Sequence, residues 1–387
     1  DIGKGRQEDH STLGSKIAKM AAERLSYNEQ EVAEVVFLVR QHLMFSEIAL
    51  YRDFTDEPVL HQFIDLVKMF EPMRKLFILT CADMSATAPG MLSAWKKELL
   101  LKLYDESTLL LNGKVSTPET KKVAEITEKV FKTLAGKYPE SWLKELLLVL
   151  IPRYYLITPF DKVLLDINAL SQLSKKNIQI ESRFLSDQGV TEYNLYTYDW
   201  TTSGIFSSMV GVLAAKGLHI LGAQVFTHPN GMVIDTFKVI DPDYREGATD
   251  ERVASIVTTI EAVLRGEESV EVLLKKSRRF PTKKERATLS QTAKNIRIQV
   301  DNQSSHTFTV IDIFAPDKRG LLFTISKVIV GLGLSVHAAK IVTRLDQVVD
   351  VFYVLGEDQK KVTQAATIVL IQDRLKEALE KEFRNKT

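Results

Sequence analysis

Four side chains in the first quarter of the sequence are of the types that hold divalent metal ions: Asp1, His10, His42 and Asp83. Carboxylates and neutral imidazoles are metal ligands, and helical proteins build such sites from side chains on facing helices. Lys4 follows Asp1 by about one helical turn, where its ammonium could meet a phosphate oxygen as a point charge. Each residue alone also fits an ordinary role, such as a packed histidine, a capping aspartate or a solvated lysine. The expectation of a metal site therefore rests on the set.

Residues 1–110 are expected to form the successive helices that position this set. Asn28 and Glu31 have the spacing of a helix-capping pair, and Pro58 suits the first turn of a later helix. Asp83 would lie at the end of a strongly apolar helix. An unpaired carboxylate in such a place costs several kcal/mol, so we expect Asp83 to have a partner. A metal ion is the sharper expectation, and a backbone or arginine contact is the alternative.

The pattern changes near residue 190, where two copies of one small α/β unit begin. Alternating aromatic and β-branched residues predict strands, and apolar residues at helical spacing predict helices. Aligning Gly204 with Gly320 superposes the copies at an offset of 116 residues, which indicates a duplicated domain. The first copy is expected in the order β-α-β-β-α-β, with strands at 193–198, 218–227, 232–240 and 270–274 and helices at 204–215 and 248–264. The second repeats it with strands at 308–314, 334–343 and 348–354 and helices at 320–330 and 362–383, its last strand being missing or supplied from elsewhere.

The turn between Asp317 and Gly320 in the second copy could bind a small zwitterion. It leads into a helix N-terminus, whose backbone N–H groups and partial positive charge suit a carboxylate. Asp317 could meet the ammonium group of the same amino acid. The alternative is a plain strand-to-helix turn with a capping aspartate. In the first copy Gly204 ends the matching turn, and Thr201 stands where the second copy has Asp317 when the two glycines are aligned.

Composition excludes several broad classes of function. The 51 Lys and Arg residues nearly balance the 50 Asp and Glu residues, leaving a net charge of +1. That balance provides no field to attract nucleic acid or an anionic membrane, and no apolar stretch reaches the roughly 18 residues of a membrane span. The single cysteine, Cys81, cannot form an intrachain disulfide, which fits a reducing, cytoplasmic location. The basic run 275–284 is interpreted as a solvated linker, with nucleic-acid contact as the alternative.

Several short segments recur together in one known family. In the first part they are Asp1-Ile2-Gly3-Lys4-Gly5, Asp9-His10-Ser11, Val39-Arg40-Gln41-His42-Leu43, Ala82-Asp83-Met84-Ser85-Ala86-Thr87 and Trp95-Lys96. In the α/β copies they are the turn 314–322 and the hairpin 231–237. In this order they closely resemble the HD domain and the tandem ACT domains of the bifunctional PII uridylyltransferase/uridylyl-removing enzymes, and the resemblance covers nearly the whole chain.

The resemblance implies a metal-dependent phosphohydrolase that removes UMP from the uridylylated PII signal protein, with Mg2+ or Mn2+ as the cofactor. A pair of such ions polarises phosphoryl oxygens and lowers the pKa of a bound water to about 7. Asp1 would bridge the two ions. His10 and His42 would hold one ion and Asp83 the other, while Lys4 would contact the phosphate. Asp1 and Lys4 are therefore the expected catalytic residues.

The resemblance also implies glutamine as an allosteric effector in the regulation of nitrogen assimilation. Its expected contacts are Asp317, Gly320 and Gly204, with the second copy favoured because Thr201 lacks a carboxylate. The family's nucleotidyltransferase domain and the His of its His-Asp doublet would precede Asp1. We therefore expect this sequence to lack the uridylyl-transferring half of the enzyme.

The implied fold class is multidomain α and α+β, with an all-helical HD-type domain followed by two ferredoxin-like (βαββαβ) ACT domains. The boundaries are an N-terminally truncated HD domain at 1–110, a helical connector at 111–185, a first ACT domain at 190–275, a basic linker and lead-in strand at 276–305, and a second ACT domain at 306–387.

Two other functions stay open from the sequence. A stringent-response (p)ppGpp hydrolase also joins an HD domain to an ACT domain, but that family carries a Glu-Asp pair where this chain has Lys4 and Gly5. A non-catalytic amino-acid-binding regulator with a degenerate HD domain is the second alternative. The joint presence of four ligand-type residues argues against it, and a metal-content measurement would distinguish it from a hydrolase.

Overall fold

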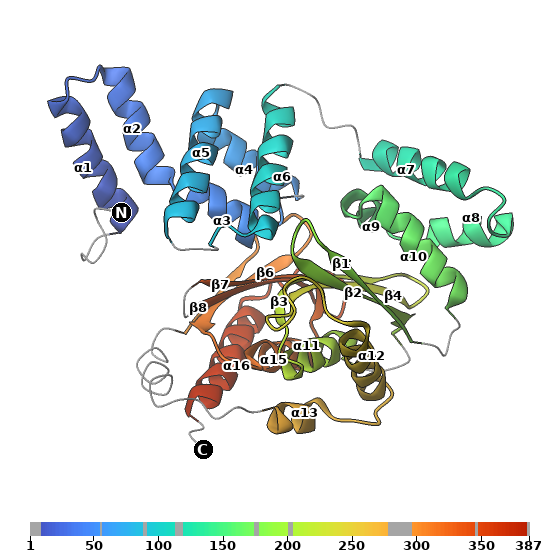
Figure 1. Ribbon diagram of the computed structural model, residues 1–387. Coiled ribbons are helices and arrows are strands. Elements are labelled where there is room, and N and C mark those ends of the chain that lie inside the picture. The colour runs from blue at the N-terminus through green and yellow to red at the C-terminus, as the bar shows by residue number, and fades with distance from the viewer. Residues whose placement is uncertain are drawn as a thin grey trace. The chain divides into compact units, whose positions relative to one another are not determined.

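The computed structural model describes residues 9–54, 56–87, 91–112, 119–173, 178–199, 204–277, 296–344 and 347–384 (Figure 1). The chain divides into two compact units, residues 1–116 and 117–387. Asp1, Lys4 and Thr201 lie outside the described residues. None of the residues described between 9 and 173 forms a strand, so the predicted all-helical character of this part is confirmed there.

The first unit is a set of helices whose ends follow local sequence rules. The carboxylate of Asp9 accepts the Thr12 N–H at the start of the first helix, and Asn28 and Glu31 form the predicted capping box at the start of the second. Buried Phe45, Phe63 and Leu76 contribute to its core. The helices are α1 (His10–Arg24), α2 (Glu29–Gln41), α3 (Met44–Tyr51), α4 (Glu57–Val67), α5 (Phe70–Thr87) and α6 (Ala94–Leu111).

The second unit is built on one continuous antiparallel sheet of eight strands, in the order β1-β2-β4-β3-β7-β8-β6-β5. We call residues 179–277 the first copy and residues 297–384 the second copy. The copies join where β3 pairs with β7, with Ala223 opposite Ala339. The strands are β1 (Gln179–Leu185), β2 (Val190–Tyr198), β3 (His219–Thr227), β4 (Met232–Ile240), β5 (Arg297–Asp301), β6 (Thr309–Pro316), β7 (Ser335–Arg344) and β8 (Gln347–Leu355).

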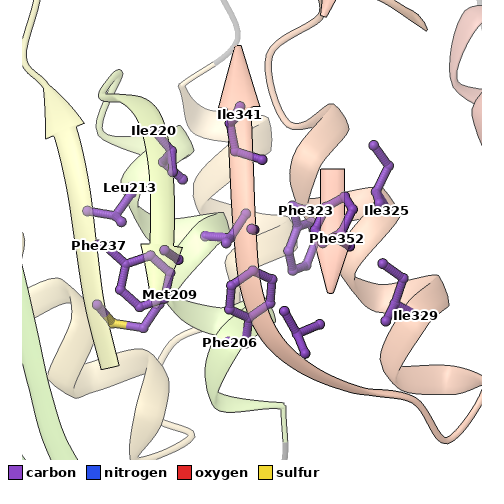
Figure 2. Close-up of a cluster of buried hydrophobic side chains, with 14 of the residues drawn as sticks. Phe206, Met209, Leu213, Ile220, Phe237, Phe323, Ile325, Ile329, Ile341 and Phe352 are labelled. Carbon is purple, nitrogen blue, oxygen red and sulfur yellow. The ribbon is translucent and has the colours of Figure 1, made fainter. Parts of the chain in front are cut away.

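One face of this sheet carries helices from both copies, which share a single hydrophobic core. Figure 2 shows Phe206 and Phe237 of the first copy near Phe323 and Phe352 of the second. The lack of a side chain at Gly211 allows Val270 of the same copy to pack closely against it, because a Cβ at Gly211 would lie 2.2 Å from a methyl group of Val270. The helices are α11 (Ile205–Ala215), α12 (Asp250–Leu264) and α13 (Val270–Lys276) in the first copy, and α15 (Leu321–Gly331) and α16 (Ala365–Arg384) in the second.

The opposite face of the first copy is covered by four further helices of the same unit (Figure 1). Tyr154, Val163 and Ile167 from these helices pack against Tyr196 and Phe226 of the sheet. The first copy is therefore buried on both faces, which explains why nearly all of β2 is buried. The helices are α7 (Glu119–Leu134), α8 (Glu140–Val149), α9 (Pro152–Ile157) and α10 (Phe160–Gln172).

The strand order within each copy differs from the prediction. Residues 270–274, expected as the last strand of the first copy, belong to helix α13. Val270, Leu273 and Leu274 have helical rather than alternating spacing, and Val270 is buried against the shared core. The edge strand comes from the N-terminal side instead, since β1 pairs with β2 and β5 with β6. The second copy thus has the order ββαββα, and the first has the same order followed by α13, rather than βαββαβ. Strand β1 lies inside the range 111–185 assigned to a helical connector.

Candidate functional site

The structure brings His10 and His42 together in the first unit. His10 is the first residue of α1, and His42 caps the C-terminal end of α2. Their ring centroids are 5.6 Å apart and the ring planes meet at 78°. His42 is buried, with 8% of its surface exposed. Two residues that are far apart in sequence therefore place their imidazoles at one point, as the metal-site hypothesis requires.

The hydrogen bonding of His42 identifies the nitrogen that can serve as a ligand. Its Nδ1 lies 2.8 Å from the Val39 carbonyl oxygen, which can only accept, so Nδ1 carries the proton in the neutral ring. The lone pair of the neutral ring then resides on Nε2. Metal-binding histidines usually show this arrangement, in which a carbonyl fixes the tautomer through the other nitrogen. Beside His10, the hydrogen bond from Thr12 holds the pKa of Asp9 below its ordinary value, and His10 adds to the same effect.

Asp83 lies on α5, which reaches the end of α2. Thr80, one turn earlier on the same helix, has its hydroxyl 3.4 Å from the His42 carbonyl oxygen. Asp83 itself is half-buried. Within the described ranges no three His, Cys, Asp or Glu side chains are grouped closely enough to hold an ion. The structure thus pairs His10 with His42 and does not gather Asp83 with them into a group of three. The predicted bridging residue, Asp1, is outside those ranges, so the four-residue convergence stays a prediction.

The two predicted effector turns end in glycines that need their conformational freedom. Gly204 and Gly320 cap the N-termini of α11 and α15 with φ of 69° and 81°, a region that other residues rarely adopt. Asp317 remains in contact with solvent, yet the protein packed around it raises its pKa, while His219 of the first copy acts in the opposite direction. The second turn therefore lies close to the first copy.

Strand register changes the alignment of the two turns. Leu195 lies opposite Asp235, and Ile313 lies opposite Asp350, so these pairs are equivalent. Counting forward from Leu195 and Ile313, the residue equivalent to Asp317 is Asp199. Counting back from Gly204 and Gly320, it is Thr201. The first turn is two residues longer, which explains why one sequence offset could not align both of its ends.

Asp235 and Asp350 are two buried acids that the sequence analysis missed. They are 1% and 2% exposed. Both oxygens of Asp235 and Oδ1 of Asp350 are buried without a hydrogen bond of ordinary geometry from the described residues, although the backbone N–H of Phe226 acts to lower the pKa of Asp235. Burial raises the pKa of each to about 8, and in Asp350 the charge of Asp317 adds to the effect. An aspartate in an apolar strand offers no sequence signal for this role, although its recurrence at the same register could have been noticed.

Lys318 and Arg319 are also missed residues of the second turn. The Arg319 guanidinium donates to the carbonyl oxygens of Ala214, Ala215 and Ser277 in the first copy. The Lys318 ammonium binds Glu382 near the end of α16. Both cations stand in the turn motif itself, but their partners are distant in sequence. Only the folded chain shows where they reach.

Comparison with known proteins gives one family model and a consistent group of relatives. A model described as "ACR9-like, ACT-like domain" matches residues 297–386. A bifunctional uridylyltransferase/uridylyl-removing enzyme from Azospirillum brasilense is 31% identical over 385 residues, which are 98% of this chain and 40% of that protein. The enzyme of the same name from Rhodospirillum rubrum is 30% identical over 383 residues, with the same coverage of both chains.

A third relative of that name, from Bradyrhizobium sp. (strain ORS 278), is 30% identical over 375 residues, covering 95% of this chain and 39% of its own length. The chain thus spans about two fifths of the length of the curated relatives it matches, and it matches their C-terminal part. None of the helices that the structure describes is long and apolar enough to cross a membrane.

Proposed function

We propose that this chain carries the uridylyl-removing and glutamine-sensing part of a bifunctional uridylyltransferase/uridylyl-removing enzyme. It corresponds over nearly its whole length to the C-terminal part of such enzymes. The first unit is the hydrolase and the two copies of the second unit are the sensor. The substrate is the uridylylated PII protein, and the location is the cytoplasm. The observation that carries the hydrolase proposal is the His10–His42 pair.

Among the donors proposed for the first unit, the carboxylates of Asp1 and Asp83 suit Mg2+ or Mn2+. His42 presents Nε2 as a ligand because its Nδ1–H is held by the Val39 carbonyl. His10 would hold the same ion as His42, Asp83 would hold the second ion, and Asp1 would contribute a carboxylate to the pair. When bound, the ions polarise the phosphoryl group and activate water. Lys4 orients the UMP phosphate by charge, and burial of His42 limits competing water at the imidazole.

In the sensor, the turn of the second copy binds glutamine through its two charged ends. The backbone N–H groups at the start of α15, after Gly320, receive the carboxylate. Asp317 receives the ammonium. Both ends need a partner, because a desolvated charge left unpaired costs more than one hydrogen bond returns. Gly204 shapes the equivalent turn in the first copy.

Histidine variants in the intact protein test the hydrolase. His42→Ala and Asp83→Ala should each reduce UMP release from uridylylated PII by about a hundredfold or more, because each removes a metal ligand. His61→Ala is the matched control, since His61 is an exposed histidine of the same unit and lies on α4. Its activity should stay at the native level. Native hydrolysis by His42→Ala would overturn the assignment, and metal content measured in parallel would show whether binding or chemistry was lost.

Calorimetry tests the sensor. Asp317→Ala should weaken glutamine binding by more than tenfold, about 1.4 kcal/mol, because the ammonium loses its carboxylate partner. Asp199→Ala is the control, since Asp199 is the strand-register equivalent in the first copy. A larger loss with Asp199→Ala would move the effector to the first turn. Unchanged glutamine affinity in both variants would show that glutamine binds at neither turn.

A further inference from the structure

Arg319 connects the candidate effector turn of the second copy to the first copy. Its Nε donates to the Ala214 carbonyl oxygen at 2.9 Å, and its two terminal nitrogens donate to Ala215 and Ser277 at 3.0 Å each. Ala214 and Ala215 are the last residues of α11, and Ser277 caps the end of α13. One side chain therefore spans two helix ends that lie far away in the sequence.

The end of α11 is well suited to hold a guanidinium. The last carbonyl groups of a helix lack intrahelical donors and carry partial negative charge, which a cation stabilises. Gly217 follows with φ of 84°, and a Cβ at this position would lie 3.2 Å from a terminal nitrogen of Arg319. Any larger residue would meet both an unfavourable backbone conformation and the guanidinium. The planar fork of arginine can satisfy several carbonyls at once, which the single ammonium of lysine cannot do.

The neighbouring cation of the same turn has a different partner. Lys318 binds Glu382 on α16, and Thr324 on α15 binds the same carboxylate at 3.2 Å. These contacts stay within the second copy, whereas those of Arg319 cross to the first. The turn is thus held from two sides by adjacent residues. Because Lys318 contacts only the second copy, its substitution is an internal control for the contact of Arg319 with the first copy.

The equivalent corner at the other end of the junction is built differently. Gly333 follows α15 as Gly217 follows α11, with φ of 71°. The Glu357 carboxylate occupies the space beside Gly333, where the Arg319 guanidinium stands beside Gly217. The residue before Gly204 is Ser203, which carries no charge. The two copies therefore share a fold but differ in the charged residues at these positions.

We propose that Arg319 is a positioning residue, which holds the effector turn of the second copy against α11 and α13 of the first. Gly320 follows Arg319 directly and Asp317 precedes it by two residues, so the anchor at Arg319 fixes the backbone that carries both ligand contacts. The ligand affinity of the second copy then depends on the first copy. This inference rests on the proposed function, because it concerns the glutamine-binding turn.

Glutamine calorimetry on the full chain tests the role, with Lys318→Ala as the matched control. Arg319→Ala should weaken binding by about tenfold or more, and Arg319→Lys should restore only part of the loss because one ammonium cannot reach all three carbonyls. Lys318→Ala should keep more of the native affinity than Arg319→Ala.

Amide hydrogen exchange supplies a readout of the anchor itself. Exchange at Gly217 and Leu218 should accelerate in Arg319→Ala and stay native in Lys318→Ala. If the native chain binds no glutamine, the sensing role fails and this inference fails with it. If the native chain binds and Arg319→Ala binds equally well, only the inference is overturned. An equal loss in Lys318→Ala would mean general disturbance of the turn and would also overturn it.

Discussion

The two copies share strand register but differ at one equivalent position that faces away from the common helix layer. Tyr196 of the first copy donates its hydroxyl to Asp166 of α10 at 2.7 Å. Phe314 of the second copy occupies the same register position, without a hydroxyl, and the Arg297 guanidinium lies 4.2 Å from its ring centre. At this position the hydroxyl of Tyr196 is what allows a hydrogen bond to α10, which Phe314 cannot make.

Asp166 is the centre of the contact between the first copy and the helices α7–α10. It is 1% exposed and accepts the hydroxyls of Tyr154 and Tyr196, each at 2.7 Å. Lys162, one turn earlier on α10, supplies the countercharge. Burial and the nearby carboxylate raise the pKa of both tyrosines far above its ordinary value, so both remain donors. The two copies thus have different side-chain attachments: the first copy binds helices α7–α10 through Tyr196, and Arg319 of the second adds hydrogen bonds to the first beyond the shared sheet and core.

The largest expected effect comes from removing the acid. Asp166→Ala should destabilise the second unit by roughly 3–5 kcal/mol, because it leaves Lys162 and two tyrosine hydroxyls buried without their partner. Denaturant unfolding would measure the change. Glu128→Ala breaks an exposed ion pair with Lys132 on α7 and should cause no measurable loss. Similarly small losses of stability in both variants would show that Asp166 is not the centre of this contact.

Converting the first copy to the residue type of the second should be the next largest effect. Tyr196→Phe should cost about 1.5–3 kcal/mol, the range for a hydrogen bond to a charged group. Tyr155→Phe is the control, since its hydroxyl donates to the neutral Leu147 carbonyl within the connecting helices, and about 0.5–1.5 kcal/mol is expected. The reverse change, Phe314→Tyr, should stay within about 0.5 kcal/mol. Equal losses in the two tyrosine variants would contradict a charged hub at Asp166.

The junction between the copies can be tested by adding one methyl group. Gly211→Ala should destabilise by about 1–3 kcal/mol, because Val270 and Phe323 would have to move away from the new Cβ. Gly331→Ala on α15 is the control, since a Cβ there meets nothing within 4 Å. It should be neutral or stabilising by about 0.5–1 kcal/mol, as alanine favours a helix. Thermal unfolding of both variants would measure the difference.

The buried acids should make stability depend on pH in both copies. An unfolded aspartate loses its proton near the ordinary value of 3.8, whereas folded Asp235 and Asp350 hold theirs to about 8. Between these values the folded state binds more protons, so stability falls as pH rises from about 4 to about 8. Asp235→Asn should be about 1–2 kcal/mol more stable than the native chain at pH 8, with a flatter pH profile. An unaltered slope in the double variant with Asp350→Asn would show that neither acid titrates in this range.

The sequence alone was sufficient where the interactions are local or periodic. The Asn28–Glu31 capping box forms as predicted because both partners lie within one helical turn. The left-handed glycines Gly204 and Gly320 stand where the turns were expected. The repeat of 116 residues indicated a duplication, whereas the change from helices to strands occurs at Gln179, about ten residues before the predicted change near residue 190. The pairing of His10 with His42 followed from residue type and resemblance.

Tertiary structure decided what depends on distant partners. The run from Val270 to Leu274 has helical spacing but is so short that this signal is weak, and packing of Val270 against Gly211 supports the helix. The edge strands β1 and β5 take the place of a C-terminal strand because a sheet edge accepts any strand of suitable register. Arg319 reaches carbonyls about a hundred residues earlier in the chain. No local rule encodes such a contact, because its free energy exists only once both helix ends have been brought together by the shared core.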